Sequence, residues 1–122
     1  MCKQDKSVQT QIISCVAHEL ELFEREYVKQ FRADDTIIQP ILNYITQKRG
    51  KSIRPVIFFL SQGLIRKPVL ESVSLAVMIE LLHTASLIHD DVVDNSKQRR
   101  GADTLNTIWD NKISILLGDY LL

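Results

Sequence analysis

The feature that most constrains the fold is a long apolar run, Val69 to Val93, which is rich in Leu, Ile, Val, Met and Ala. It contains neither glycine nor proline, the two residues that disfavour a helix interior most strongly. We therefore expect a single long helix over 69–93. Glu80, His83 and His89 interrupt its apolar character, so we do not expect this run to span a membrane.

Three aspartates, Asp90, Asp91 and Asp94, stand at the C-terminal end of this predicted helix. At about 100° per residue, Asp90 and Asp94 fall on one face, one turn apart, with Asp91 beside them. Their carboxylates repel one another close to the negative end of the helix dipole. Mg²⁺ would neutralise such a cluster, because it binds carboxylate oxygens and completes its shell with water and substrate phosphates. Arg99 and Arg100 follow, and their guanidinium groups suit phosphate oxygens. The alternative is a solvated helix end followed by a solvated turn.

A second charged segment surrounds Gly50, with Lys51 and Arg54 just after it. Glycine allows the backbone to turn, and Pro55 is expected to open a helix whose N-terminal dipole favours an anion. The simpler interpretation is a charged loop. Together with the aspartates, the segment favours an anion-binding site.

His83 lies seven residues before Asp90 and therefore on nearly the same helix face. A lone histidine on an apolar helix is usually a structural core residue. Its alignment with the aspartates favours a contact with a diphosphate instead. His89 points elsewhere, and we expect it to be structural.

The rest of the chain is predicted to be mainly helical. Apolar residues at three- and four-residue spacing predict one amphipathic helix over 7–31. Asp34 or Asp35 is expected to cap a second helix that ends near residue 48. Further helices are expected over 56–64 (core), 105–110 and from 111 onward, with a polar loop over 95–106.

Length and composition limit the possible classes of protein. The 122 residues allow at most one domain, and 45% hydrophobic with 25% charged residues is ordinary for a soluble protein. Fifteen basic and fifteen acidic residues give no net charge, so we expect no nucleic-acid partner. Cys2 and Cys15 have no metal-ligand or redox spacing, and the N-terminus has no signal-peptide core; we expect a cytoplasmic protein.

The segment ELLHTASLIHDDVVDNSKQRRG, Glu80 to Gly101, resembles the first aspartate-rich motif of the trans-type (E-type) polyprenyl diphosphate synthases. Gly50 to Pro55 resembles the basic GKxxRP motif of the same family. The similarity continues downstream and includes Thr104, Asn106, Trp109, Asn111, Lys112 and 117–120. It implies an all-α antiparallel helical bundle of the isoprenoid synthase type, with only the N-terminal helices present.

The resemblance also implies roles for the site residues. Asp90 and Asp94 would bridge Mg²⁺ to an allylic diphosphate, with Asp91 in support, and Arg99 would contact the same diphosphate. The side chains that would bind isopentenyl diphosphate are those of Lys51, Arg54, His83 and Arg100.

Product length in this family depends on residues one turn before the aspartates. Those residues are Ala85 and Ser86 here, and both are small. The resemblance therefore implies a long polyprenyl product of the kind used for quinone side chains. It also implies a homodimer in the complete protein.

Two departures from the family pattern bear on function. Arg49 stands where a glycine is usual, and Ser52 where a basic residue is usual. The chain also ends at Leu122 without the family's second aspartate-rich motif. We therefore expect residues 1–122 to be the N-terminal portion of a single polyprenyl synthetase domain, inactive alone.

Two alternatives remain open. The chain could be a non-catalytic truncated product, or a partner subunit that binds a diphosphate or another protomer without turnover. A class I terpene cyclase also uses DDxxD, but it does not account for GKxxRP together with His83 and RRG.

Overall fold

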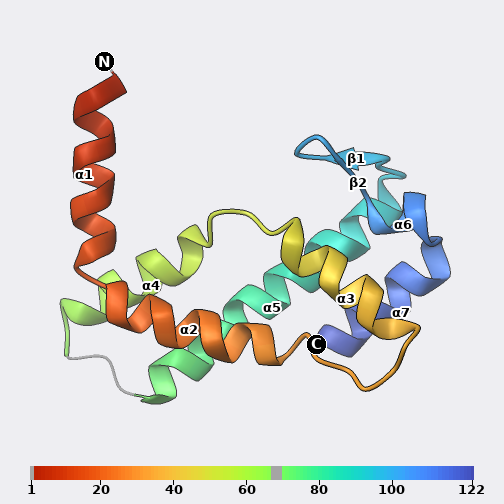
Figure 1. Cartoon of the computed structure of the whole chain (residues 1–122), viewed down its shortest axis with the longest axis horizontal. Helices are drawn as coiled ribbons and strands as arrows, with labels where there is room; N and C mark the ends of the chain where they lie inside the picture. Colours follow the sequence, from red (N-terminus) through yellow and green to blue (C-terminus); the bar gives the residue numbers. More distant parts are fainter. Residues whose placement is uncertain (1, 67–69) are drawn as a thin grey trace. The chain divides into compact units, whose positions relative to one another are not determined.

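The computed structural model describes residues 2–66 and 70–122, and the burial of the side chains in these ranges from residue 8 onward (Figure 1). The regular secondary structure of the described residues is helical apart from one short antiparallel hairpin. The chain divides into two compact units, Met1–Val77 and Met78–Leu122. Helix α5, Leu70–Val93, begins in the first unit and ends in the second, which confirms the predicted long helix. Val69, the first residue of the predicted range, lies outside the described residues.

The first unit contains α1 (Cys2–Ser14), α2 (Ala17–Lys29), α3 (Ile38–Gln47) and α4 (Ile53–Gly63). Its core is aromatic: Phe23, Tyr27 and Phe31 are buried, with successive ring centroids 5.4 and 4.9 Å apart. Leu42 and Phe59 are fully buried as well. The core side chains of α2 recur every four residues, as an amphipathic helix requires.

The predicted single helix over 7–31 is wrong, because it breaks between α1 and α2. Val16 has φ −124° and ψ 20°, outside helical geometry, and its side chain is buried. The amides of Cys15 and Val16 donate to the carbonyls of Ile12 and Ile13, which tightens the last turn of α1. The break leaves Val16 in the core, while Ile12 and Ile13 are exposed.

Asp35 caps α3, as predicted. Its Oδ1 atom accepts hydrogen bonds from the amides of Ile37 and Ile38, at 2.7 and 3.2 Å. These amides have no partner within the helix, so the carboxylate satisfies them and complements the positive end of the dipole.

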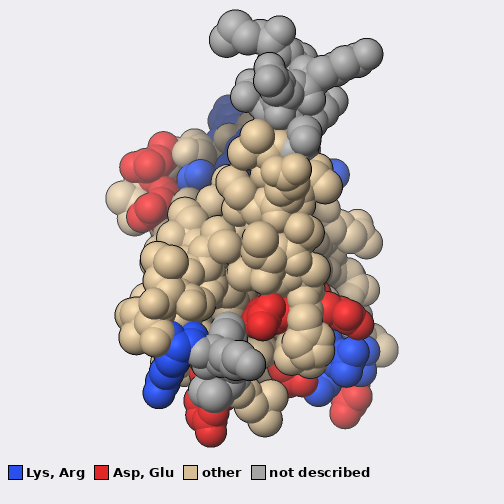
Figure 2. All heavy atoms as spheres, turned by 90° about the vertical axis from the view of Figure 1, so that its left-hand side faces the viewer, with Lys and Arg blue, Asp and Glu red and all other residues tan. Residues whose placement is uncertain are grey.

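Helix α4 begins at Ile53, so Pro55 lies within its first turn rather than opening it. The prediction that this helix is entirely core is wrong. Pro55 and Phe59 are buried, but Ile57 and Leu64 are exposed. Figure 2 views the molecule from the side on which α1 and α4 lie in Figure 1, and the centre of this face is largely uncharged.

The second unit contains the C-terminal part of α5, strands β1 (Gln98–Arg99) and β2 (Ala102–Asp103), and helices α6 (Leu105–Ile108) and α7 (Asn111–Leu121). Asp110 caps α7 by accepting hydrogen bonds from the amides of Lys112 and Ile113. His89 joins α5 to α7, because its Nε2 atom lies 3.2 Å from the carbonyl oxygen of Ile115. This contact supports the structural role predicted for His89.

By length and composition alone, α5 is apolar enough to cross a membrane, and 39% of its most apolar stretch is buried. This criterion is weak, because core helices of soluble proteins also meet it. The expectation that the chain does not span a membrane stays a prediction.

Candidate functional site

Asp90 and Asp91 lie in the last turn of α5, Asp94 directly follows it, and a Schellman motif ends the helix there. The amide of Ser96 donates to the carbonyl of Asp91 at 2.9 Å, and that of Asn95 to the carbonyl of Val92 at 3.3 Å. Asn95 has φ 51°, the left-handed conformation that this motif needs and that asparagine tolerates. The motif fixes the point at which the chain leaves the helix, directly after Asp94.

Asp90 and Asp94 lie one turn apart, and both are exposed. Within the described part of the chain, neither carboxylate accepts a hydrogen bond or forms an ion pair. They lie at the negative end of the helix dipole, so each adds to an unfavourable local potential. A cation at this end of the helix would therefore be stabilised by both carboxylates.

Asp91 is in a different environment, because it is buried and paired with Arg99 of β1. Arg99 donates from Nε to both carboxylate oxygens, at 3.0 and 3.2 Å, and from Nη2 to Oδ1 at 2.8 Å. The hydrogen bond to Asp91, and the negative charges of Asp91, Asp90 and Asp94, raise the pKa of Arg99. Arg99 therefore carries a fixed positive charge beside the three aspartates.

The predicted polar loop over 95–106 contains a β-hairpin, which corrects that prediction. Gln98 pairs with Asp103 and Arg99 with Ala102, so Arg100 and Gly101 form a two-residue turn. Both turn residues have positive φ, 52° and 76°, as a type I′ turn requires. Arginine is uncommon in this conformation, so Arg100 is held at the hairpin tip with some backbone strain.

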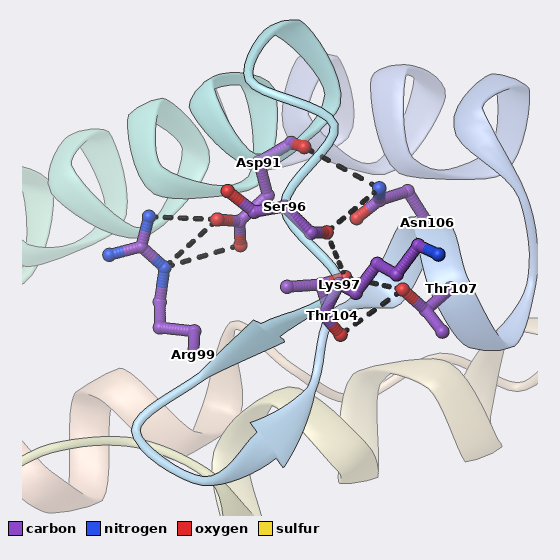
Figure 3. A network of polar contacts seen from close by, with 7 residues as sticks. All are labelled: Asp91, Ser96, Lys97, Arg99, Thr104, Asn106 and Thr107. Carbon is purple, nitrogen blue, oxygen red and sulfur yellow. Dashed lines mark hydrogen bonds and ion pairs between the residues drawn. The ribbon is translucent and has the colours of Figure 1, made fainter.

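Five residues close the base of the hairpin (Figure 3). The hydroxyl of Thr104 and the side-chain amide of Asn106 both donate to the carbonyl of Ser96, at 2.7 and 3.2 Å. The amide of Thr104 and the hydroxyl of Thr107 both donate to the carbonyl of Lys97. Hydrogen bonds therefore join the segment that enters the hairpin to the segment that leaves it, next to the start of β1.

The donor set suits Mg²⁺ in one specific way. Among the described residues, no three His, Cys, Asp or Glu side chains are arranged to hold a metal ion. Asp90 and Asp94 offer two carboxylates, and Mg²⁺ commonly takes one or two from the protein and the rest of its ligands from water and substrate phosphates. The residues thus fit a metal that binds together with a phosphorylated substrate.

Three further predicted residues lie on α5. His83 is partly buried and lies about two helical turns before Asp90. Ala85 is fully buried, whereas Ser86 is exposed and its hydroxyl donates to the carbonyl of Leu82. The roles of all three in binding and product length stay predictions.

Lys51 and Arg54 lie in the first unit, and both are exposed near the start of α4. The positive φ of this segment falls on Ser52, at 49°. The contribution of Lys51 and Arg54 to a diphosphate site stays a prediction.

Arg49 packs into the first unit. Its guanidinium lies 4.5 Å from the ring centroid of Tyr27 and pairs with Glu24 of α2. Arg49 therefore joins α2 to the segment before α4, a role that local sequence patterns did not reveal.

The sequence also did not reveal the hydrogen bonds among Ser96, Thr104 and Asn106. Asn106 donates to the carbonyls of Asp91 and Ser96, and thus links the aspartate segment to the hairpin base. The available signal was the resemblance itself, because Thr104 and Asn106 fall inside the segment that matches the family pattern.

Comparison with known proteins identifies the relatives of this chain. Residues 35–122 match the family described as Polyprenyl synthetase. The chain is 37% identical over 105 residues to "Heptaprenyl diphosphate synthase component 2" of Bacillus subtilis, an alignment that covers 85% of this chain and 30% of that protein. It is 36% identical over 121 residues to the octaprenyl diphosphate synthase of Haemophilus influenzae, which covers 99% of this chain and 37% of that protein.

Among solved structures, it is similar to a polyprenyl synthase from Caulobacter crescentus complexed with calcium and isoprenyl diphosphate, with a TM-score of 0.83 and 29% identity. That match covers 92% of this chain and 34% of the Caulobacter chain. The chain thus spans only about a third of the length of these relatives. The similarity confirms the predicted all-α fold of the isoprenoid synthase type. By sequence and by fold, the chain belongs to the polyprenyl synthetase family.

Proposed function

We propose that this protein acts in prenyl transfer, condensing isopentenyl diphosphate onto an allylic prenyl diphosphate. The single observation that carries the proposal is the exposed pair Asp90 and Asp94 beside the ion-paired Arg99. Family membership supports the reaction class. The Caulobacter relative was crystallised with a divalent cation and an isoprenyl diphosphate, which supports the ligand class.

In this mechanism, Asp90 and Asp94 would hold Mg²⁺, which when bound supplies charge stabilisation to the leaving diphosphate. Arg99 would bind the same diphosphate through its charge-assisted hydrogen bonds. The C–O bond of the allylic substrate breaks, and both electrons leave with the diphosphate.

The remaining site residues act on the second substrate. Lys51, Arg54, His83 and Arg100 would bind isopentenyl diphosphate and orient its double bond toward the allylic carbon. The double bond forms the new C–C bond, and transfer of a proton from the adjacent carbon to the departed diphosphate restores an alkene. Apolar side chains around the reacting carbons would exclude water that would otherwise capture the cation.

We further propose a long-chain product of the quinone side-chain type. Ala85 and Ser86, before the aspartates, are both small and would let a growing chain pass. The names of the relatives, heptaprenyl and octaprenyl diphosphate synthase, support the same product class. We propose a cytoplasmic setting and a homodimer on the sequence grounds given above.

One specific observation favours a second candidate function. The Bacillus subtilis relative is named component 2 of its synthase, a name that implies another component. The present chain would then be a partner subunit that binds a diphosphate or a protomer without turning substrate over by itself.

Calorimetry with farnesyl diphosphate, combined with radiolabelled isopentenyl diphosphate incorporation, separates these functions. The expected result is binding that needs Mg²⁺ and is lost in Asp90→Ala/Asp94→Ala. Incorporation into longer products supports the prenyltransferase and would contradict the expectation that residues 1–122 are inactive alone. Mg²⁺-dependent binding without incorporation by residues 1–122 fits both functions, and a longer chain that contains this sequence then separates them. Incorporation by the longer chain supports the prenyltransferase, and continued absence of incorporation supports the partner subunit. Equal binding with EDTA present, or by the double variant, would overturn both.

A further inference from the structure

The three aspartates divide into two kinds of group. Asp90 and Asp94 are exposed, whereas Asp91 is 8% exposed. Asp91 also accepts three hydrogen bonds from a single guanidinium. Arg99 occupies three of the roughly four lone-pair sites of this carboxylate, which leaves fewer sites for a cation than Asp90 and Asp94 offer. The burial and the contacts of Asp91 therefore point to a role other than metal binding.

Arg99 is held along only one edge of its guanidinium. Nε and Nη2 face Asp91, while Nη1 donates no hydrogen bond within the described residues and the side chain is 40% exposed. An arginine has five N–H donors in a fixed planar arrangement, so the edge that Asp91 leaves open still presents donors to a phosphate. The pairing thus limits the rotation of the guanidinium without using up its binding capacity.

The backbone that carries Arg99 is fixed as well. Asn106 donates to the carbonyl of Asp91 and to that of Ser96, so one side chain spans the end of α5 and the hairpin base. Thr104 closes the same base through the carbonyls of Ser96 and Lys97 (Figure 3). Arg99 is therefore restrained at its backbone by the hairpin and at its side chain by Asp91.

We propose that Asp91 is a positioning residue, which orients the Arg99 guanidinium toward the diphosphate and is not itself a metal ligand. This proposal rests on the proposed function, and it names how one residue of that site acts. Restraining a donor in its binding geometry before the ligand arrives reduces the entropy lost on binding. The two members of the pair therefore act as one unit.

The experiment measures binding of farnesyl diphosphate and, separately, of inorganic pyrophosphate, each over a range of Mg²⁺ concentrations. Asp91→Asn should raise the Kd for both ligands about tenfold, the loss of one charge-assisted hydrogen bond. The Mg²⁺ concentration for half-maximal binding should stay within about twofold of the original. Asp90→Asn is the matched control, because the same change at a proposed metal ligand should raise that Mg²⁺ concentration.

Coupling gives a second readout that a merely structural residue would not produce. Arg99→Lys keeps the positive charge but removes the planar guanidinium. Adding Asp91→Asn to Arg99→Lys should therefore cause no further loss of affinity. In the ligand-free protein, the Arg99 Nε–H should give a protected NMR resonance. Because this resonance is measured in the original protein, it tests the pairing of Asp91 with Arg99 even if the Asp91→Asn variant does not fold.

The outcomes are distinct. An Mg²⁺ requirement that rises in Asp91→Asn as in Asp90→Asn would make Asp91 a metal ligand and overturn the proposal. Tighter ligand binding by Asp91→Asn would also overturn it, because Asp91 would then compete with the ligand for Arg99. Additive losses of affinity in the double variant Asp91→Asn/Arg99→Lys would overturn the proposal as well. An Arg99 Nε–H resonance that is not protected in the ligand-free protein would do the same. Failure of the original protein to bind farnesyl diphosphate, with pyrophosphate still bound, would instead reject the prenyl-transfer function.

Discussion

The imidazole of His89 occupies the space that a side chain at residue 118 would fill. A Cβ atom placed on Gly118 would lie 2.1 Å from Nε2 of His89, far inside van der Waals contact. The close approach lets the His89 ring reach the carbonyl oxygen of Ile115 on α7. Gly118 therefore serves the packing of α5 against α7 and not a turn.

Gly118→Ala should destabilise the protein by about 1–3 kcal/mol, because the methyl group forces the His89 ring to move. Chemical denaturation measures the change. Gly63→Ala is the matched control, since a Cβ there meets nothing within 4 Å and should stabilise by about 0.4–1 kcal/mol. In a His89→Ala background, the cost of Gly118→Ala should largely disappear. A cost unchanged by His89→Ala would show that the ring is not the obstacle.

Arg100→Asn should stabilise the protein by about 0.5–1 kcal/mol, because asparagine adopts positive φ at lower cost than arginine. The same change should weaken binding of isopentenyl diphosphate, since it removes the proposed phosphate contact. Thermal unfolding and calorimetry measure the two effects. Lys97→Asn, at an exposed position before β1, removes one positive charge without relieving the turn and should not stabilise. A gain in stability with full affinity would separate Arg100 from the site.

Ser52→Gly should raise the free energy of unfolding by about 0.5–1 kcal/mol, because Ser52 has φ 49° and glycine removes that strain. The serine hydroxyl is buried without a hydrogen-bond partner among the described residues, so the change removes no favourable contact. The same substitution at Ser61, inside α4, should lower stability by about 0.5 kcal/mol through helix propensity. Urea titration of both variants tests the opposite signs, and a loss at Ser52 would contradict the strain argument.

In a complete enzyme that contains this sequence, Ser86→Phe should shorten the polyprenyl product if the growing chain passes the face of α5 before Asp90. The exposed position leaves room for the ring, whereas Ala85 is fully buried. Ala85→Phe should also shorten the product, and should in addition cost about 1–3 kcal/mol by overpacking. Ser74→Phe, on an exposed part of the same helix, is the control and should leave the product unchanged. Chromatography of dephosphorylated products measures chain length. An unchanged product in both Ser86→Phe and Ala85→Phe would place the chain elsewhere.

The long helix and the helix cap of this protein could be predicted from the sequence, whereas the helix break and the short hairpin could not. An uninterrupted apolar run of more than six turns leaves few alternatives to α5, and a capping aspartate marks the start of α3. The break at Val16 carries no glycine or proline and keeps the apolar spacing, so no local signal reveals it. The hairpin has strands of two residues each, too short for any alternation to be visible.

The candidate site was predicted in composition but not in its internal contacts. Charge and spacing single out Asp90, Asp91, Asp94 and Arg99, because carboxylates crowded at a helix C-terminus require a cation. They do not distinguish the paired Asp91 from its exposed neighbours, since that difference depends on where the hairpin returns. The pair of Arg49 and Glu24 was missed for the same reason, because it joins segments twenty-five residues apart.

Hydrogen bonds join the two ends of the hairpin, so the segment between Lys97 and Thr104 could be replaced as a unit. Because the entering and leaving chains are joined before β1 starts, a different tip could be grafted there without altering the ends of α5 and α6. The hydrogen bonds from Arg99 to Asp91 would restrict which replacements keep the orientation of residue 99. Ligand preference could then diversify at the tip while the helical scaffold stays the same.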